Sequence, residues 1–403
     1  MKTFEIFFAL ISLTVISIAS AAPAAVDSAH WTVDDTLTNE WASAWEISPD
    51  CHHAVWVKNI PDVGQDQLFA GGNLNAGGNL YLSSLTEQTN EIQLTDGSEC
   101  RNPRWSPDGK RIAFISSRAD AKTGNKANAQ VWLIDPSDKE VRQLTEGDQD
   151  VWAFEWSDAE HILFLKPDAP APPAGQAKKK QSDPAWVAED ETPQIPVRLF
   201  EIELQSKRVT RLTENTDRIG EFWVSPDGSH VVTHHSRSLR NSYDRSCRPI
   251  IVLTDLKSGE RKQVFSDPRF NLNQLRWQRD GQGFYLLSNI ATNPKYQYPS
   301  ILEVYHYTLS TGAIEKVNLD WANELSYRIE FSSWKLGFEV TGDGFVALLA
   351  NGVRPKAARY HYVSNAWHRE WLTGIHTNLI GFRIGNDDKT LVYEYSDATH
   401  PSQ

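Results

Sequence analysis

The fold of this protein is decided by the stretch "WSPDGKRIAF", which runs from Trp105 to Phe114. Ser-Pro-Asp-Gly favours a tight β-turn, because proline suits its second position, glycine suits its fourth, and Ser or Asp side chains bond the local backbone. The residues that follow the turn are rich in β-branched and aromatic types, as buried strands are. The stretch therefore predicts a β-hairpin.

Altered copies of this phrase recur along the 403-residue chain, at intervals of 44 to 68 residues. Ser106 follows Trp105 in this phrase. The equivalent residues in the other copies are Ser48, Ser157, Ser225, Gln278, Thr341 and Gly385. A second phrase follows each of the first six copies and consists of an apolar strand, a polar turn and a short strand; residues 131–147 are the clearest example. Two hairpins per repeat predict a four-stranded antiparallel sheet.

A small sheet of this kind cannot bury both of its faces alone, and stacking several around an axis solves the problem. We therefore expect an all-β protein, a β-propeller of about seven four-stranded blades. Only one hairpin is recognisable in the seventh repeat, near residues 385–395. The last blade is expected to be incomplete, with a bare sheet edge that invites self-association.

The N-terminus predicts export. An apolar run from Ile6 to Ala19 precedes small residues, which indicates a signal peptide over residues 1–21 and a secreted or periplasmic protein. The run is short for a membrane span, although a retained anchor is the alternative, and no later segment is long and apolar enough to span. Residues 22–40 then form an N-terminal segment and residues 41–403 the propeller, with a Pro- and Ala-rich insertion loop over 166–184.

Composition argues against several classes of function. The formal net charge of −12 argues against nucleic acid as a partner, because such binding needs clustered Lys and Arg. Three cysteines allow at most one internal disulfide, for which Cys51 with Cys100 is conceivable. No Cys-x-x-Cys pair or His/Cys ligand cluster predicts a metal site, and no cofactor is expected.

The phrase "WSPDGKRIAFISSR", paired with "VWLIDPSDKEVRQLTEG", resembles the repeats of two groups of propellers. One group is the TolB-like propellers, and the other is the N-terminal propeller of the prolyl oligopeptidase family of serine peptidases, especially its dipeptidyl and acylaminoacyl branches. Uneven blades with long insertions, residues 185–204 and the ending "LVYEYSDATHPSQ" are more similar to the peptidases. In that family the propeller caps a C-terminal α/β-hydrolase domain and admits only short or unfolded peptides.

The chain departs from this family in one respect: the Gly-x-Ser-x-Gly phrase that carries the catalytic serine is not found in it. No catalytic residue can be transferred, and the hydrolase domain is expected to be absent from this chain. The resemblance thus implies a substrate-gating portion of a secreted exopeptidase, not catalytic by itself, whose partners are peptide substrates or a hydrolase domain. The alternatives are a stand-alone TolB-like propeller that binds a protein or peptide, and a truncated inactive product.

The candidate substrate-binding residues are Glu189, Asp190 and Glu191, an acidic cluster that follows Trp186. In dipeptidyl peptidases, propeller carboxylates hold the free α-amino group of the substrate, and a carboxylate pair suits a cationic amine through charge-assisted hydrogen bonds. The family's usual acidic pair is not matched clearly. The alternative is a solvated loop, because short acidic runs are usually exposed.

Three other features are interpreted as structural. His234 and His235 are adjacent on a predicted strand, so they face opposite sides and cannot easily share a ligand; the same holds for His52 and His53. The run Glu146–Asp150 lacks a full calcium-loop pattern and is interpreted as a turn between blades. The tryptophans at the turns, Trp45, Trp105, Trp156, Trp223 and Trp277, are expected to pack between blades.

Overall fold

The computed structural model describes residues 40–59, 78–87, 91–96, 99–118, 128–168, 195–239, 247–267, 270–289, 302–323, 325–326, 337–352, 354–364, 366–376 and 379–395. Every regular element in these ranges is a β-strand, which confirms the all-β prediction. The predicted signal peptide, most of the N-terminal segment and the acidic cluster at residues 189–191 lie outside them. Within the described residues no helix is long and apolar enough to cross a membrane.

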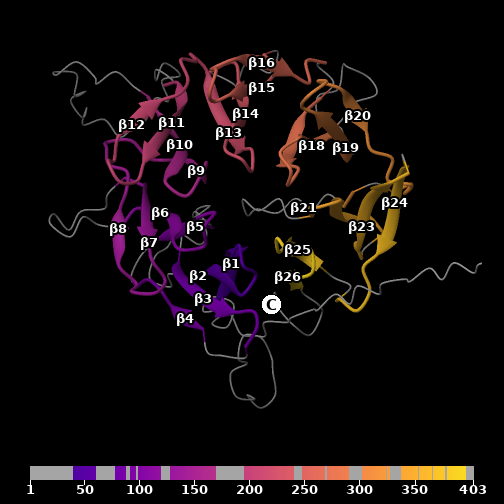
Figure 1. The fold of residues 1–403 in the computed structure, drawn as a ribbon, viewed down its shortest axis with the longest axis horizontal. Helices are drawn as coiled ribbons and strands as arrows, with labels where there is room; N and C mark the ends of the chain where they lie inside the picture. The colour runs from indigo at the N-terminus through magenta and orange to yellow at the C-terminus, as the bar shows by residue number, and fades with distance from the viewer. Residues whose placement is uncertain are drawn as a thin grey trace, which may run out of the picture. The chain divides into compact units, whose positions relative to one another are not determined.

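The strands pair into small antiparallel sheets in chain order, as the two-hairpin repeat predicts (Figure 1). The first sheet has the order β1 (Trp41–Ile47), β2 (His53–Asn59), β3 (Asn79–Ser84), β4 (Ile92–Gln93). The second has the order β5 (Cys100–Trp105), β6 (Ile112–Ser116), β7 (Gln130–Ile134), β8 (Val141–Gln143).

The next two repeats join into one eight-stranded sheet. It contains β9 (Ala153–Trp156), β10 (His161–Pro167), β11 (Val197–Glu203) and β12 (Val209–Arg211), followed by β13 (Arg218–Val224), β14 (His230–Ser236), β15 (Ile250–Asp255) and β16 (Arg261–Val264). The two groups of four meet through a parallel pairing of β11 with β13, at Val197 and Arg218. Each group otherwise has the predicted antiparallel order.

The last three repeats give two four-stranded sheets and one hairpin. Their strands are β17 (Leu272–Trp277), β18 (Gly283–Asn289), β19 (Leu302–Thr308) and β20 (Ile314–Lys316), then β21 (Phe338–Thr341), β22 (Gly344–Leu349), β23 (Lys356–Val363) and β24 (Ala366–Trp371). The seventh repeat supplies β25 (Leu379–Ile384) and β26 (Leu391–Tyr395), which form a two-stranded sheet within the described residues.

The turns at Gly109 and Gly228 share one geometry, as their common phrase predicts. Their φ angles are 70° and 68°, a left-handed conformation that glycine adopts without steric cost. Each glycine N–H donates a hydrogen bond of 2.9 Å to the carbonyl of the serine three residues earlier. Cys51 occupies the same place in the first copy, with a φ of 60°. The repeat assignment from sequence is therefore confirmed at the level of backbone conformation.

A buried threonine lies two residues after the fourth strand of three repeats. The hydroxyls of Thr95, Thr145 and Thr213 accept hydrogen bonds of 2.9–3.0 Å from the backbone N–H groups of Leu80, Val131 and Leu199. Each threonine thus satisfies a buried N–H of the third strand where the ladder of backbone bonds with the fourth strand stops. Each of these threonines follows a leucine in the sequence, at Leu94, Leu144 and Leu212, and this contact explains the recurrence of the Leu-Thr pair.

The chain divides into two compact units, which are described separately: residues 1–109 with 317–403, and residues 110–316. In the second unit the cores lie between consecutive sheets. One contains Phe164 and Phe200 with Ile115 from the preceding sheet, a second contains Leu165 and Ile219, and a third contains Val232 and Phe284. Face-to-face packing buries both faces of each small sheet, which is the stacking that the repeats predict.

In the first unit the hairpin β25–β26 contacts both the sheet β21–β24 and the sheet β1–β4. Leu379, Phe382 and Leu391 pack on Val346 and Leu348 of β22. Side chains on the first strands of these three sheets are also in contact. Arg383 of β25 pairs with Glu339 of β21, and its guanidinium carbon lies 6.0 Å from the centre of the Trp45 ring of β1. The single hairpin of the seventh repeat therefore lies between the sixth sheet and the first.

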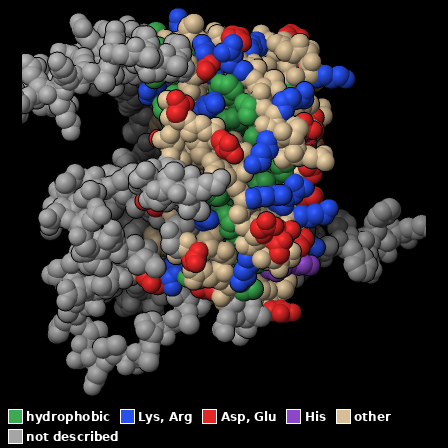
Figure 2. Space-filling view, turned by 90° about the vertical axis from the view of Figure 1, so that its left-hand side faces the viewer, with side chains coloured by type: hydrophobic (Ala, Val, Ile, Leu, Met, Phe, Trp, Pro, Cys, Tyr) green, Lys and Arg blue, Asp and Glu red, His purple; other side chains and the backbone are tan. Residues whose placement is uncertain are grey.

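All three cysteines are free thiols, so the conceivable Cys51–Cys100 disulfide is not formed. On the face seen in Figure 2, Lys and Arg side chains lie among Asp and Glu side chains, with hydrophobic side chains visible between them.

Candidate functional site at the base of the insertion

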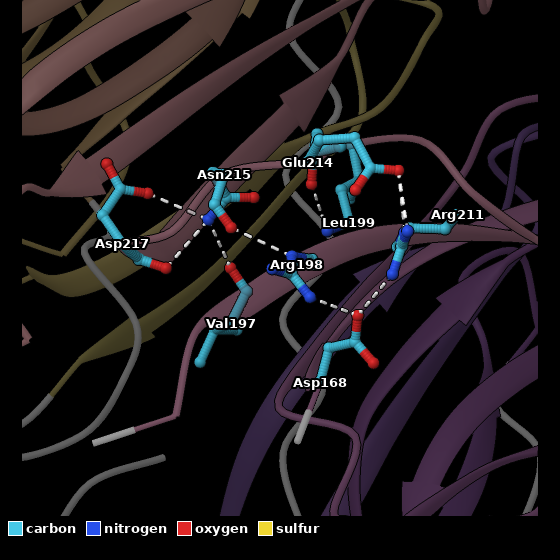
Figure 3. Close-up of polar contacts among 9 residues, drawn as sticks. Asp168, Val197, Arg198, Leu199, Arg211, Glu214, Asn215 and Asp217 are labelled. Carbon is cyan, nitrogen blue, oxygen red and sulfur yellow. Dashed lines mark hydrogen bonds and ion pairs between the residues drawn. The ribbon is translucent and has the colours of Figure 1, made fainter. Parts of the chain in front are cut away.

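The predicted acidic cluster lies outside the described residues, but both ends of the connection that carries it are described. β10 continues to Pro167, two residues into the predicted loop, and β11 begins at Val197. The backbone N–H of Asp168 donates a hydrogen bond of 2.9 Å to the carbonyl of Pro196. The two ends are thus held side by side, and the side chains around them form the candidate site (Figure 3).

Asp168 is the first centre of this site. Its Oδ2 accepts hydrogen bonds from Nη1 of Arg198 at 2.5 Å and from Nη1 of Arg211 at 3.0 Å. Burial raises the pKa of Asp168, but the hydrogen bonds and charges of the two arginines outweigh it and hold that pKa below its ordinary value. The carboxylate is therefore ionised at neutral pH, and its charge is neutralised from two strands, β11 and β12.

Asn215 is the second centre and links the third repeat to the fourth. Its Nδ2 donates to the carbonyl of Val197 at 2.9 Å, to the carbonyl of Asp217 at 2.8 Å and to Oδ1 of Asp217 at 2.9 Å. The backbone carbonyl of Asn215 accepts a hydrogen bond of 2.9 Å from Nε of Arg198. These contacts surround the parallel pairing of Val197 with Arg218, so they fix the point at which β11 and β13 meet.

A hydroxyl, an imidazole and a carboxylate are joined by hydrogen bonds, and the carboxylate is the one that Asn215 contacts. Nε2 of His235 lies 2.9 Å from Oγ1 of Thr233, and Nδ1 of His235 lies 2.9 Å from Oδ1 of Asp217. This is the order of groups in a serine-hydrolase triad. However, Thr233 and His235 are only 2% and 7% exposed, so a substrate carbonyl cannot reach the hydroxyl. The arrangement can stabilise the sheet but cannot catalyse acyl transfer in this state.

Asp217 is ionised in this arrangement. Burial raises its pKa, but hydrogen bonds from His235 and Asn215 outweigh the effect, and the pKa lies below its ordinary value. Because an ionised carboxylate accepts hydrogen bonds only, Nδ1 of His235 must carry the proton that it donates.

His234 lies in a different environment from His235, as expected for adjacent residues that face opposite sides of a strand. Its Nδ1 lies 3.5 Å from Oε2 of Glu221. It also lines a pocket of about 120 Å³ with Arg237, Arg248, Phe265 and Phe270 among others. Ligand pockets for small molecules are usually about 300 Å³ or larger, so this one suits a single side chain or carboxylate.

The run Glu146–Asp150 connects β8 to β9, as its interpretation as a turn predicts. Oδ1 of Asp150 accepts a hydrogen bond of 2.7 Å from the N–H of Ala129, and the carbonyl of Gln149 accepts one of 3.0 Å from Gln130. Its oxygen atoms are thus used to hold neighbouring strands. No group of three or more His, Cys, Asp or Glu side chains in the described ranges is arranged to hold a metal ion.

The tryptophans at the turns are packing residues. Trp45, Trp105 and Trp277 are buried, and the half-buried Trp156 and Trp223 pack against hydrophobic cores. Packing between consecutive repeats is confirmed for Trp156, Trp223 and Trp277, whereas for Trp45 and Trp105 burial alone is shown.

Sequence reasoning did not identify the residues that build this site. Asp168 and its partners Arg198 and Arg211 are 30 and 43 residues apart, and Asp217 lies 18 residues from His235. No motif spacing joins such positions, because the pairing of β10 with β11 and of β13 with β14 brings them together. The insertion itself was the only signal in the sequence that pointed to this region.

Two curated relatives match the chain in sequence, and both are named as peptidases. Dipeptidyl-peptidase 5 of Porphyromonas endodontalis is 22% identical over 290 residues, which is 71% of this chain and 34% of that protein. The uncharacterized peptidase YuxL of Bacillus subtilis is 25% identical over 215 residues, or 50% of this chain and 30% of that protein. The matches therefore span about a third of the relatives' length. No protein-family profile matches the chain.

Solved structures show the same fold. Acylaminoacyl peptidase of Pyrococcus horikoshii has a TM-score of 0.58 and 18% identity, covering 93% of this chain and 52% of that one. The β-propeller domain of the Trilobed protease of Pyrococcus furiosus has a TM-score of 0.55 and 12% identity, covering 90% and 94%. TolB of Acinetobacter baumannii also matches, with a lower TM-score of 0.44.

These findings agree with the repeats, the sheet order and the turn geometry described above. The chain is a β-propeller that is similar in sequence to dipeptidyl-peptidase 5 and in fold to acylaminoacyl peptidase, which are serine peptidases of the prolyl oligopeptidase family.

Proposed function

We propose that this chain is the substrate-gating propeller portion of a secreted serine exopeptidase and does not hydrolyse peptides by itself. The observation that carries the proposal is the match to dipeptidyl-peptidase 5, which covers 71% of the chain, together with the propeller fold shared with acylaminoacyl peptidase. The signal-like N-terminus supports export. N-terminal sequencing of protein recovered from an export-competent host tests that part: the expected start is residue 22 or 23.

The lack of hydrolysis is supported by the described chemistry. A hydroxyl needs an accessible position as well as a neighbouring base to act as a nucleophile on a peptide carbonyl. Thr233 has the base, His235, but is 2% exposed. Among the described residues, this pair is therefore excluded as a nucleophile for peptides, and we propose that the nucleophile belongs to a hydrolase domain that acts on peptides admitted by the propeller.

The acidic cluster of Glu189, Asp190 and Glu191 is the proposed site for the α-amino group of a peptide. Carboxylates recognise an ammonium group through charge-assisted hydrogen bonds. At the described base of the insertion, Asp168 is already neutralised by Arg198 and Arg211, so it has little charge left for a second cation. The unassigned acidic residues of the connection are therefore better candidates than the described one.

Binding assays with matched peptides test this proposal. The double variant Glu189→Gln with Glu191→Gln should weaken binding of a peptide with a free N-terminus and leave binding of its acetylated form unchanged. Glu214→Gln is the matched control, because this exposed glutamate pairs with Arg211 at the same base. Equal loss for both peptides, or an equal effect of the control, contradicts amine recognition by the cluster.

The edge of the seventh repeat supports a further part of the proposal, self-association. β26 pairs with β25 and with no other strand in the described residues. Strand edges of this kind pair readily with other chains. Sedimentation across a concentration series should show oligomers, whereas a monomer at every concentration contradicts the idea.

A further inference from the structure

Two histidines lie directly opposite each other on the outer pair of strands of the sixth repeat. His361 of β23 is paired with His368 of β24, and the ring centres are 5.8 Å apart with an angle of 17° between the ring planes. His361 is half-buried and His368 is exposed. Neither imidazole has a hydrogen bond or an ion pair with another described residue. Their nitrogen atoms thus have no described protein partner.

The described neighbours of the two rings on this face are a glycine and two charged side chains. On its other side His361 is paired with Gly344, which has no side chain; a Cβ there would lie 2.0 Å from the carbonyl oxygen of Tyr360, so the position is restricted to glycine. Residues two positions along a strand share a face, which places Arg359 and Glu370 next to the histidines. Arg359 is bound to Asp343 at 2.9 Å, and Glu370 is exposed.

We propose that His361 and His368 together bind a divalent transition-metal ion. Neutral imidazole is a good ligand for Cu²⁺, Ni²⁺ and Zn²⁺, and its metal–nitrogen bonds of about 2.0–2.1 Å lie in the plane of the ring. The two rings are stacked here, so rotation about their side-chain bonds must turn one nitrogen of each toward the same ion. Water fills the other coordination positions, and the Glu370 carboxylate is the acidic group on the same face. The site is open, with two protein nitrogen ligands.

The chemistry of this pair differs from that of the other paired histidines. His235 is bound by Asp217 and Thr233, and His234 lies beside Glu221, so their nitrogens are engaged within the protein. A directly opposed pair in an antiparallel sheet fixes both ligands on one face, and the second bond to the metal then forms within the molecule. The affinity should therefore depend on both rings together.

Calorimetric titration of the full chain with Ni²⁺ tests the proposal. The wild type should bind one Ni²⁺ at this site, and His361→Asn or His368→Asn should each weaken that binding on the order of tenfold or more, because either loss removes the chelate. The double variant should resemble the single ones. His52→Asn is the matched control, because His52 is also an exposed histidine, with a side chain 62% exposed, and it directly precedes β2 rather than lying in β23 or β24.

A second measurement separates loss of the ligand from loss of the fold. Ni²⁺ should raise the melting temperature of the wild type and of His52→Asn, but not of the His361 and His368 variants, whose circular dichroism should match the wild type. Cu²⁺ should bind more tightly than Ni²⁺, and acid should weaken both, because protons compete for imidazole. No binding to the wild type, or equal binding to the folded single variants, overturns the proposal.

Discussion

Oδ1 of Asp217 and Nδ1 of His235 lie 2.9 Å apart, and this contact links the entry of β13 to the end of β14. Asp217 also accepts a hydrogen bond from Asn215, whose side chain reaches the backbone of β11. A single carboxylate therefore connects the third repeat to the fourth at the point where their sheets join. The stability of this region should depend on the charge of Asp217.

Asp217→Asn is expected to lower the free energy of unfolding at neutral pH by about 1–2 kcal/mol, since a partly exposed carboxylate loses charge-assisted bonds while His235 stays buried. The folded-state pKa of Asp217 lies below its ordinary value of 3.8, so its stabilising effect is complete above that value and is lost as pH falls through the folded-state pKa. Urea titrations of the wild type and of Asp217→Asn at several pH values measure this difference in the free energy of unfolding.

The difference between wild type and Asp217→Asn should accordingly shrink in acid. Glu214→Gln provides the comparison, because its side chain is 68% exposed and should matter little at any pH. A difference for Asp217→Asn that stays constant down to the lowest pH would show that its charge does not stabilise the fold.

Asp168 should be coupled more strongly to Arg198 than to Arg211. Both arginines bind the same oxygen, but Arg198 is 16% exposed and Arg211 is 43% exposed, so solvent screens the second pair more. Double-mutant cycles with Asp168→Asn and either Arg198→Gln or Arg211→Gln measure the two couplings. The Arg198 cycle should give about 1 kcal/mol, near the upper end for partly exposed pairs. Equal couplings would contradict the assignment of Arg198 as the main partner.

Two glycines of the same turn type should respond differently to alanine. Gly109 and Gly228 have the same left-handed φ, which costs an alanine about 1–2 kcal/mol. A Cβ at Gly228 would also lie 2.3 Å from the carbonyl oxygen of Ser157, whereas at Gly109 the nearest atom is 3.7 Å away. In thermal unfolding, the melting temperature of Gly228→Ala should be well below that of Gly109→Ala.

Gly259 is the control for backbone strain alone, since its φ is 75° and no atom lies within 4 Å of an added Cβ. Gly259→Ala should resemble Gly109→Ala. Similar losses for all three variants would mean that the contact between the turn of Gly228 and Ser157 has relaxed and adds nothing.

The sequence predicts the repeats of this fold well, because each turn and each strand depends on neighbouring residues. Ser106 and Ser225 begin hairpins as expected, and the seventh repeat shows a single hairpin. The join between β11 and β13 was not predicted, because it depends on side-chain contacts of Asn215 rather than on any periodic pattern.

The candidate site was less predictable than the fold. The acidic residues 189–191 were identified from composition and resemblance, and they remain a prediction. Asp168 lay within the predicted loop, where nothing in its neighbours marks it as the partner of two arginines on later strands. Such contacts follow from strand register, which is set only when the sheets have formed.

We propose that this propeller binds peptides and does not cut them. The most direct test of this proposal is to incubate the purified chain with a short peptide that has a free N-terminus, measure binding by fluorescence anisotropy, and analyse the recovered peptide by mass spectrometry. We predict saturable binding and complete recovery of intact peptide. Cleavage that a serine-directed inhibitor blocks, or no binding at any concentration, would contradict the account.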